Sequence, residues 1–111
     1  MSVLLVMTNL PDRATAETLA ARVVEERLAA CVNILAPCVS LYQWRGAVER
    51  AEEVPLLIKT TEERYPLLES LIRSAHPYET PEIVAIPIVA GSPEYLAWIA
   101  AETQTERWPS P

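Results

Sequence analysis

Residues 39–60 of this 111-residue chain read VSLYQWRGAVERAEEVPLLIKT, and this stretch decides the fold. The run Cys31–Trp44 before the glycine, bent at Pro37, matches in length the run Val48–Thr60 after it. Two β-prone runs on either side of a short glycine turn predict a β-hairpin. We therefore expect a long hairpin that turns at Arg45-Gly46.

The segment before the hairpin predicts two strands and a helix. Val3–Thr8 is short and aliphatic, as is typical of a buried strand. Asp12 is a suitable N-cap for a helix in which apolar residues recur at helical spacing over Ala16–Val23. Cys31–Leu35 predicts the next strand, and Pro37 forces a bend or bulge after it.

The segment after the hairpin predicts helix, strand and helix. Thr60-Thr61-Glu62-Glu63 has the form of a capping box and is expected to open the second helix. Ile83–Val89 predicts the last strand. Ser92 and Pro93 are expected to be the N-cap and first residue of the last helix. Residues 103–111 are expected to form a polar tail that frays.

The order of elements predicts the fold class. Strand, helix, strand, strand, helix, strand and a C-terminal helix form the split βαβ plan of a ferredoxin-like α+β sandwich. We expect one domain over residues 1–111, with its core over residues 3–102. The second and fourth strands should lie at the sheet edges, where Pro37 and Pro87 are tolerated. Pro55 is expected where the hairpin extends beyond the sheet.

Composition excludes several classes of partner. Half of the residues are hydrophobic, but no apolar run approaches the roughly 18 residues of a membrane span. The net charge of −6 argues against nonspecific nucleic-acid binding and favours cations or neutral partners. The N-terminus has no secretory pattern, so a cytoplasmic protein is expected. Cys31 and Cys38 suggest neither a zinc framework nor a disulfide scaffold.

The predicted sheet has more apolar surface than one subunit can bury. Leu41, Tyr42 and Trp44 lie near the hairpin turn, and Tyr95 and Trp98 lie on the last helix. A soluble protein rarely leaves such a surface in contact with water. Self-association is therefore expected.

The first candidate site is His76-Pro77-Tyr78-Glu79-Thr80-Pro81-Glu82, which contains the only histidine of the chain. The two prolines restrict the backbone, so the segment should be a stiff connector. Imidazole and carboxylate are suitable ligands for copper, zinc or nickel, and His76, Glu79 and Glu82 are close in sequence. The alternative is that His76 caps the preceding helix.

Three further groups are candidates. The hairpin's returning arm carries a carboxylate cluster that is either a cation site or a solvated edge: Glu49, Glu52 and Glu53. Tyr42 and Trp44 form either an interface or a ligand-stacking platform. Lys59 ends a buried strand and either pairs with a carboxylate or holds an anion.

Catalysis is not expected. The two glycines, Gly46 and Gly91, are too far apart for a phosphate-binding loop, and no nucleophile elbow or thiol-protease signature is present. One histidine with nearby carboxylates is thin support for acid–base chemistry.

Several segments in register resemble the CutA divalent-cation tolerance family over residues 3–102. They are Ala29-Ala30-Cys31-Val32-Asn33, Tyr42-Gln43-Trp44-Arg45-Gly46, Ile58-Lys59-Thr60-Thr61, His76-Pro77-Tyr78-Glu79-Thr80-Pro81-Glu82-Ile83 and Gly91-Ser92-Pro93-Glu94-Tyr95-Leu96-Ala97-Trp98. The resemblance implies a cytoplasmic, PII-like homotrimer in which the long hairpins join neighbouring subunits. It also implies a link to copper and other divalent cations, with no established catalytic activity.

The resemblance places copper ligands at positions that match Met7, Ala75 and His76. Of these, His76 carries over, Met7 is a soft thioether better suited to Cu(I), and Ala75 cannot coordinate a metal. We therefore expect weak binding of Cu²⁺ or another divalent cation, with His76, Glu79 and Met7 as the ligands.

Two functions follow as hypotheses. The first is a non-catalytic homotrimer that binds a divalent metal ion or a small molecule in clefts between subunits. The second is a trimeric structural or signalling adaptor for a partner protein, in which metal binding is incidental. Neither involves nucleic acid or a membrane.

Overall fold

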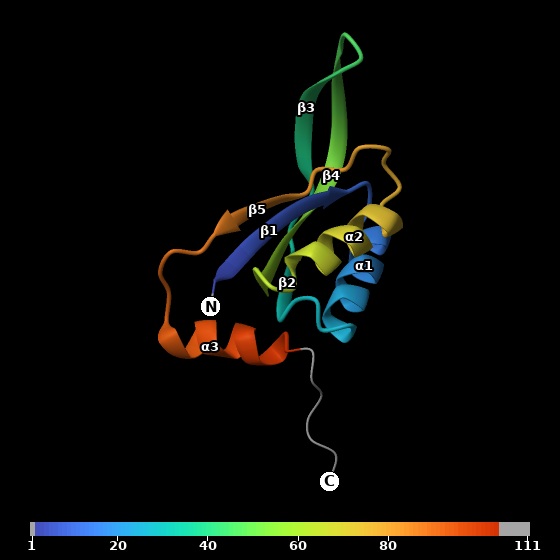
Figure 1. Ribbon diagram of the computed structural model, residues 1–111. Helices are drawn as coiled ribbons and strands as arrows, with labels where there is room; N and C mark the ends of the chain where they lie inside the picture. The colour runs from blue at the N-terminus through green and yellow to red at the C-terminus, as the bar shows by residue number, and fades with distance from the viewer. Residues whose placement is uncertain (1, 105–111) are drawn as a thin grey trace.

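The structure is a computed structural model that describes residues 2–104. The returning strand of the predicted hairpin pairs with three other strands of the sheet. The first half of β4 (Ala47–Thr61) pairs with β3 (Cys38–Trp44). Its second half lies between β1 (Val3–Leu10) and β2 (Cys31–Ile34). The strand β5 (Val84–Pro87) pairs with the other side of β1, so the described sheet has the order β2-β4-β1-β5 (Figure 1).

This topology confirms the ferredoxin-like α+β class. Every pairing is antiparallel, and the predicted second and fourth strands, β2 and β5, lie at the edges. Pro87 ends β5, where the missing N–H costs no central hydrogen bond. Pro55 lies opposite Asn9 near the end of β1, between the part of β4 that pairs with β2 and the part that pairs with β3. The hairpin leaves the sheet at that point, as expected.

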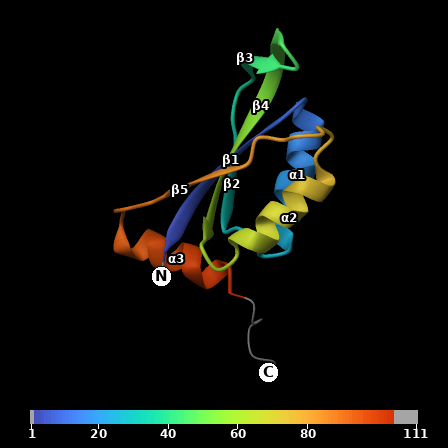
Figure 2. The same cartoon turned by 45° about the horizontal axis from the view of Figure 1, so that its top comes forward.

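The helices α1 (Arg13–Glu25) and α2 (Tyr65–Ala75) cover one face of the sheet (Figures 1 and 2). The core between these layers includes Val6 and Leu10 of β1, both fully buried. Because successive side chains of a strand point to opposite faces, Met7 and Asn9 lie on the other face. Asp12 caps α1, as predicted: its Oδ1 accepts a hydrogen bond of 2.8 Å from the Thr15 N–H.

The hairpin projects well beyond the rest of the sheet (Figure 1). Its turn requires left-handed backbone at two positions, Arg45 with φ 49° and Gly46 with φ 85°. Two such residues form the turn whose twist matches that of the flanking strands. The arms carry exposed apolar side chains: Val39 is 53 %, Leu41 70 % and Val48 69 % exposed.

The predicted capping box is wrong. Thr60 and Thr61 are the last residues of β4, and α2 begins at Tyr65 after an Arg64 N-cap whose side chain makes no capping hydrogen bond. The Thr60 hydroxyl instead donates to the Leu28 carbonyl at 2.7 Å, which links β4 to the loop after α1. Pro66 explains the late start, because proline is tolerated in the first turn of a helix but not further in.

The last helix, α3 (Pro93–Glu102), begins after Ser92 as predicted, although the Ser92 side chain makes no capping hydrogen bond. Only Ile99 of the helix is fully buried, and Leu96 and Ala100 are partly buried. Thr103 closes the helix with a 2.8 Å hydrogen bond to the Ile99 carbonyl. The rest of the predicted tail, residues 105–111, lies outside the described residues. None of the helices within residues 2–104 is long and apolar enough to span a membrane.

Candidate functional site

His76 lies where α2 ends and the connector to β5 begins. Its backbone N–H donates to the Ile72 carbonyl at 2.9 Å, so it is the C-cap of α2. The side chain is only 7 % exposed, and its ring lies against Tyr78 with a centroid distance of 4.7 Å. His76 therefore caps α2 through its backbone, which agrees with the helix-capping alternative.

Both ring nitrogens of His76 are engaged in hydrogen bonds. Nε2 is 2.6 Å from the carbonyl oxygen of Asn9, and Nδ1 accepts a 3.1 Å bond from the Tyr78 N–H. Because a carbonyl oxygen can only accept, the proton lies on Nε2. A metal ion binds through a free lone pair on nitrogen, so an ion at His76 requires one of these two bonds to break.

The other two predicted metal ligands lie apart from the His76 ring nitrogens. Met7 is partly buried on the sheet face opposite the α1–α2 core. Both carboxylate oxygens of Glu79 accept hydrogen bonds from Nη2 of Arg45, at 2.9 and 3.1 Å. No group of three or more His, Cys, Asp and Glu side chains in residues 2–104 is placed to hold a metal ion. The described residues of this chain therefore do not fit a resident metal ion.

A groove is lined by residues of the hairpin and of the connector. Figure 1 shows the connector passing the base of the hairpin. The groove has a volume of about 970 Å³ and takes residues from the end of β1, both arms of the hairpin and residues 78–82. Polar and charged side chains line one part of it: Asn9, Ser40, Glu49, Glu53, Glu79, Thr80 and Glu82. The groove therefore brings together three of the predicted candidates: the hairpin carboxylates, the aromatic pair of Tyr42 and Trp44, and the connector.

The hairpin carboxylates do not form a uniform solvated edge. Glu49 and Glu53 line the groove, whereas Glu52 is exposed and points to the opposite face of β4. Glu53 is only 8 % exposed. Burial, together with a hydrogen bond to the Glu53 carboxylate, raises the pKa of Tyr78 to about 12. The solvated-edge interpretation is therefore wrong for Glu53.

Aromatic side chains form the apolar part of the groove. Tyr42, Trp44 and Tyr78 line it, and Trp44 is also in contact with the guanidinium of Arg45, 5.1 Å from the ring centroid. A cation within about 6 Å of an aromatic face is attracted to the ring quadrupole. Arg45 thus lies between an aromatic ring and a carboxylate, Glu79.

Lys59 lies outside the groove and pairs with no carboxylate among the described residues. Its Nζ donates to Oδ1 of Asn33 at 2.6 Å, and it lies 6.0 Å from the centre of the Tyr95 ring. It therefore links β4, β2 and α3. Cys31 and Cys38 are free thiols, each partly buried.

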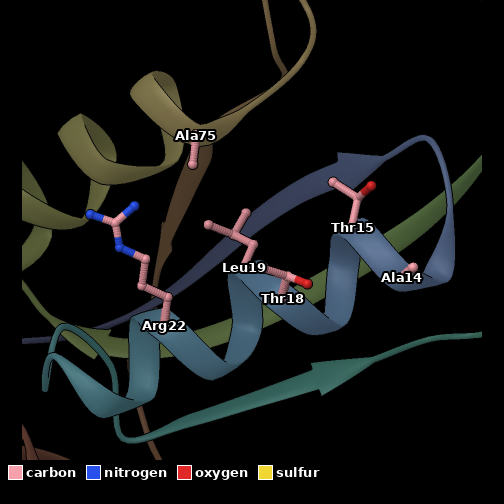
Figure 3. Close-up of a pocket in the computed structure, with 6 residues that line it drawn as sticks. All are labelled: Ala14, Thr15, Thr18, Leu19, Arg22 and Ala75. Carbon is pink, nitrogen blue, oxygen red and sulfur yellow. The ribbon is translucent and has the colours of Figure 1, made fainter.

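A second, smaller pocket of about 310 Å³ lies between α1 and the end of α2 (Figure 3). The methyl group of Ala75 and the side chains of Thr18 and Leu19 line it. Its charged residue, Arg22, already donates to Glu26 at 2.7 Å. Ala75 thus lies between the helices, whereas the ring of the adjacent His76 reaches Asn9. This pocket contains none of the predicted metal ligands.

Sequence reasoning missed two polar residues of the groove, Asn9 and Ser40, and the shared face of two others. Asn9 lies near the end of β1, and its Nδ2 donates to Oε1 of Glu82 at 3.2 Å across 73 positions of the chain. No local pattern indicates a contact of that range. The alternation of residues 49, 51 and 53 along a strand was the available signal that Glu49 and Glu53 share a face.

Comparisons with known proteins agree on one family. The model of the CutA1 divalent ion tolerance protein family matches residues 4–102. The divalent-cation tolerance protein CutA of Thermus thermophilus is 46 % identical over 98 residues, which are 88 % of this chain and 95 % of that protein.

Solved structures give the same result. The Cut A1 divalent cation tolerance protein of Thermus thermophilus superposes with a TM-score of 0.90 at 44 % identity, covering 92 % of this chain and 99 % of the other. CutA1 of Oryza sativa superposes with a TM-score of 0.91 at 34 % identity, covering 96 % and 97 %. The chain therefore belongs to the CutA1 divalent ion tolerance protein family.

Proposed function

We propose that this protein is a non-catalytic homotrimer that binds a divalent cation or a small ligand in clefts between its subunits. One observation carries the proposal: the apolar hairpin projects from the fold directly beside an acid-lined groove. A hairpin that is buried by a neighbouring subunit would turn this groove into a cleft between subunits.

The exposure of the hairpin supports the assembly. Val39, Leu41 and Val48 are each more than half exposed, and Tyr42 and Trp44 are partly exposed beside them. Large apolar side chains that are exposed on one projecting element of a soluble chain mark an interaction site. Closed symmetric assembly of identical chains is the usual way to cover such a surface.

The charge of the groove supports cation binding. Its described lining includes four glutamates and no lysine or arginine. Several carboxylates that share one cleft favour cations at that place. Since the described residues of one subunit do not form a three-donor cluster, a metal ion in this cleft would take ligands from two subunits.

The assembly is tested by light scattering of the purified protein. A homotrimer has a mass of 3 × 12.4 = 37.2 kDa. A monomer mass at micromolar concentration would contradict the proposal. A cytoplasmic location and the absence of nucleic-acid partners stay predictions.

The predicted metal ligands are tested by calorimetry with Zn²⁺ and Cu²⁺. Weak binding that is lost in His76→Gln and in Met7→Leu would establish His76 and Met7 as ligands. Binding that persists in both variants but weakens in Glu49→Gln would place the ion at the groove carboxylates. No heat of binding with either ion would contradict the metal part of the proposal.

A further inference from the structure

The groove contains more carboxylates than positively charged side chains that pair with them. Glu49, Glu53, Glu79 and Glu82 line it, and among the described residues Arg45 alone forms an ion pair with one of them, Glu79. Glu82 accepts a hydrogen bond from the neutral amide of Asn9. A groove with this excess of negative charge attracts a cation from solution.

Glu53 is the most buried of these four carboxylates. Its side chain is more than nine-tenths buried, and its neighbour in the groove is the neutral phenol of Tyr78. A buried carboxylate is stabilised by a positive partner, and no ion pair of Glu53 is present among the described residues. The Tyr78 phenol donates a hydrogen bond to this carboxylate, but the negative charge of Glu53 has no positive partner among the described residues.

The geometry is better suited to an organic cation than to a bare metal ion. A metal ion requires three or more donors that converge at about 2.0 to 2.6 Å, and the described residues offer no such cluster. The groove has a volume of about 970 Å³, which is the size of a small-molecule pocket. The aromatic rings of Tyr42, Trp44 and Tyr78 supply apolar walls that a hydrated metal ion does not use.

Arg45 of the hairpin is an example within the chain of an organic cation held by an aromatic ring and a carboxylate. Its guanidinium lies 5.1 Å from the centre of the Trp44 ring while Nη2 donates to both oxygens of Glu79. An aromatic face and a carboxylate together are a recurrent way to hold a guanidinium or ammonium group. The arrangement of Tyr42, Tyr78 and Glu53 in the same groove offers a second set of groups of the same chemistry.

We propose that the groove binds a small organic cation with a guanidinium or ammonium head, which pairs with Glu53 while its apolar body lies against the aromatic walls. This inference rests on the proposed function, because it names the class of ligand that the same cleft accepts.

The test compares two probes of nearly the same shape, butylguanidinium and neutral butylurea, by calorimetry on the full chain. Butylguanidinium is expected to bind, and butylurea is expected to give no measurable heat. Glu53→Gln should weaken butylguanidinium binding by about tenfold or more, because it removes the charge and keeps the shape. Glu52→Gln is the matched control, since this neighbour is exposed on the opposite face of β4 and should leave the affinity unchanged.

Light scattering on the same samples separates this inference from the proposed function. A protein that is trimeric but binds both probes equally, or neither, overturns the inference alone. Equal loss of affinity in the Glu53 and Glu52 variants also overturns it, because the effect would then follow net charge and not the groove. A monomer that binds butylguanidinium in a Glu53-dependent way supports the inference and refutes the assembly.

Discussion

The buried polar side chains of this fold differ in whether they have hydrogen-bond partners. Thr60 donates to a backbone carbonyl, and His76 uses both ring nitrogens. Thr8 is fully buried on β1, and its hydroxyl has no hydrogen-bond partner among the described residues. A buried hydroxyl without a partner costs the free energy of its desolvation.

Thr8→Val should therefore stabilise the protein. The substitution keeps the branched shape and removes an unsatisfied polar group, so the free energy of unfolding should rise by about 1 kcal/mol. Chemical denaturation measures this change. Thr60→Val is the matched control: its hydroxyl donates to the Leu28 carbonyl, so the same change should lower stability by about 1 kcal/mol. A loss of stability in Thr8→Val would show that its hydroxyl is satisfied in solution.

Tyr78 should make stability depend on pH in the alkaline range. Its pKa in the fold is raised to about 12 by burial and by Glu53, above the ordinary value of 10.0. A raised pKa favours the neutral phenol in the folded state, so its contribution is complete below pH 10 and is lost as pH rises from about 10 to about 12. Because Tyr78 is only partly buried, the loss should stay below about 2.7 kcal/mol. Denaturation of wild type and Tyr78→Phe at several pH values tests this: a fall of equal size in both would assign it to other groups.

Elements with a strong local pattern were predictable from the sequence, and those set by tertiary contacts were not. The hairpin follows from Arg45-Gly46 between two apolar runs, and α1 follows from Asp12 and the spacing of its apolar residues. The start of α2 did not follow, because Thr60 and Thr61 continue β4 through pairing with β1, which outweighs their local capping pattern.

The hairpin turn depends on left-handed backbone at Gly46. Gly46 has φ 85°, a conformation that other residues adopt only with strain, and an added Cβ would meet no atom within 4 Å. Gly46→Ala should therefore lower the free energy of unfolding by about 1 to 2 kcal/mol through backbone strain alone. Urea denaturation measures the change. In Arg45→Asn, the asparagine tolerates the left-handed conformation at φ 49°, so the loss should be smaller and limited to the exposed contacts with Glu79 and Trp44. Unchanged stability in Gly46→Ala would contradict the turn geometry.

At the scale of the whole molecule, the groove depends on topology. It combines the end of β1, the hairpin and the connector, segments that are far apart in the sequence. The sequence identified the hairpin carboxylates and the connector as separate candidates, because no local pattern shows that the fold places them on one groove. The same topology leaves apolar side chains of the projecting hairpin exposed in the described chain, so assembly is the property to test for the whole molecule.

Leu41→Glu should dissociate the proposed trimer. Leu41 is 70 % exposed in the single chain, so a charge there costs little in the monomer but is unfavourable once a neighbouring subunit covers the hairpin. Light scattering should show the mass fall from 37.2 kDa, three times 12.4 kDa, towards 12.4 kDa. The melting temperature should fall as well, because assembly stabilises the folded chain by mass action. Val24→Glu, at an exposed position of α1 away from the hairpin, should keep the full mass. An unchanged mass in Leu41→Glu would place any interface between subunits elsewhere on the molecule.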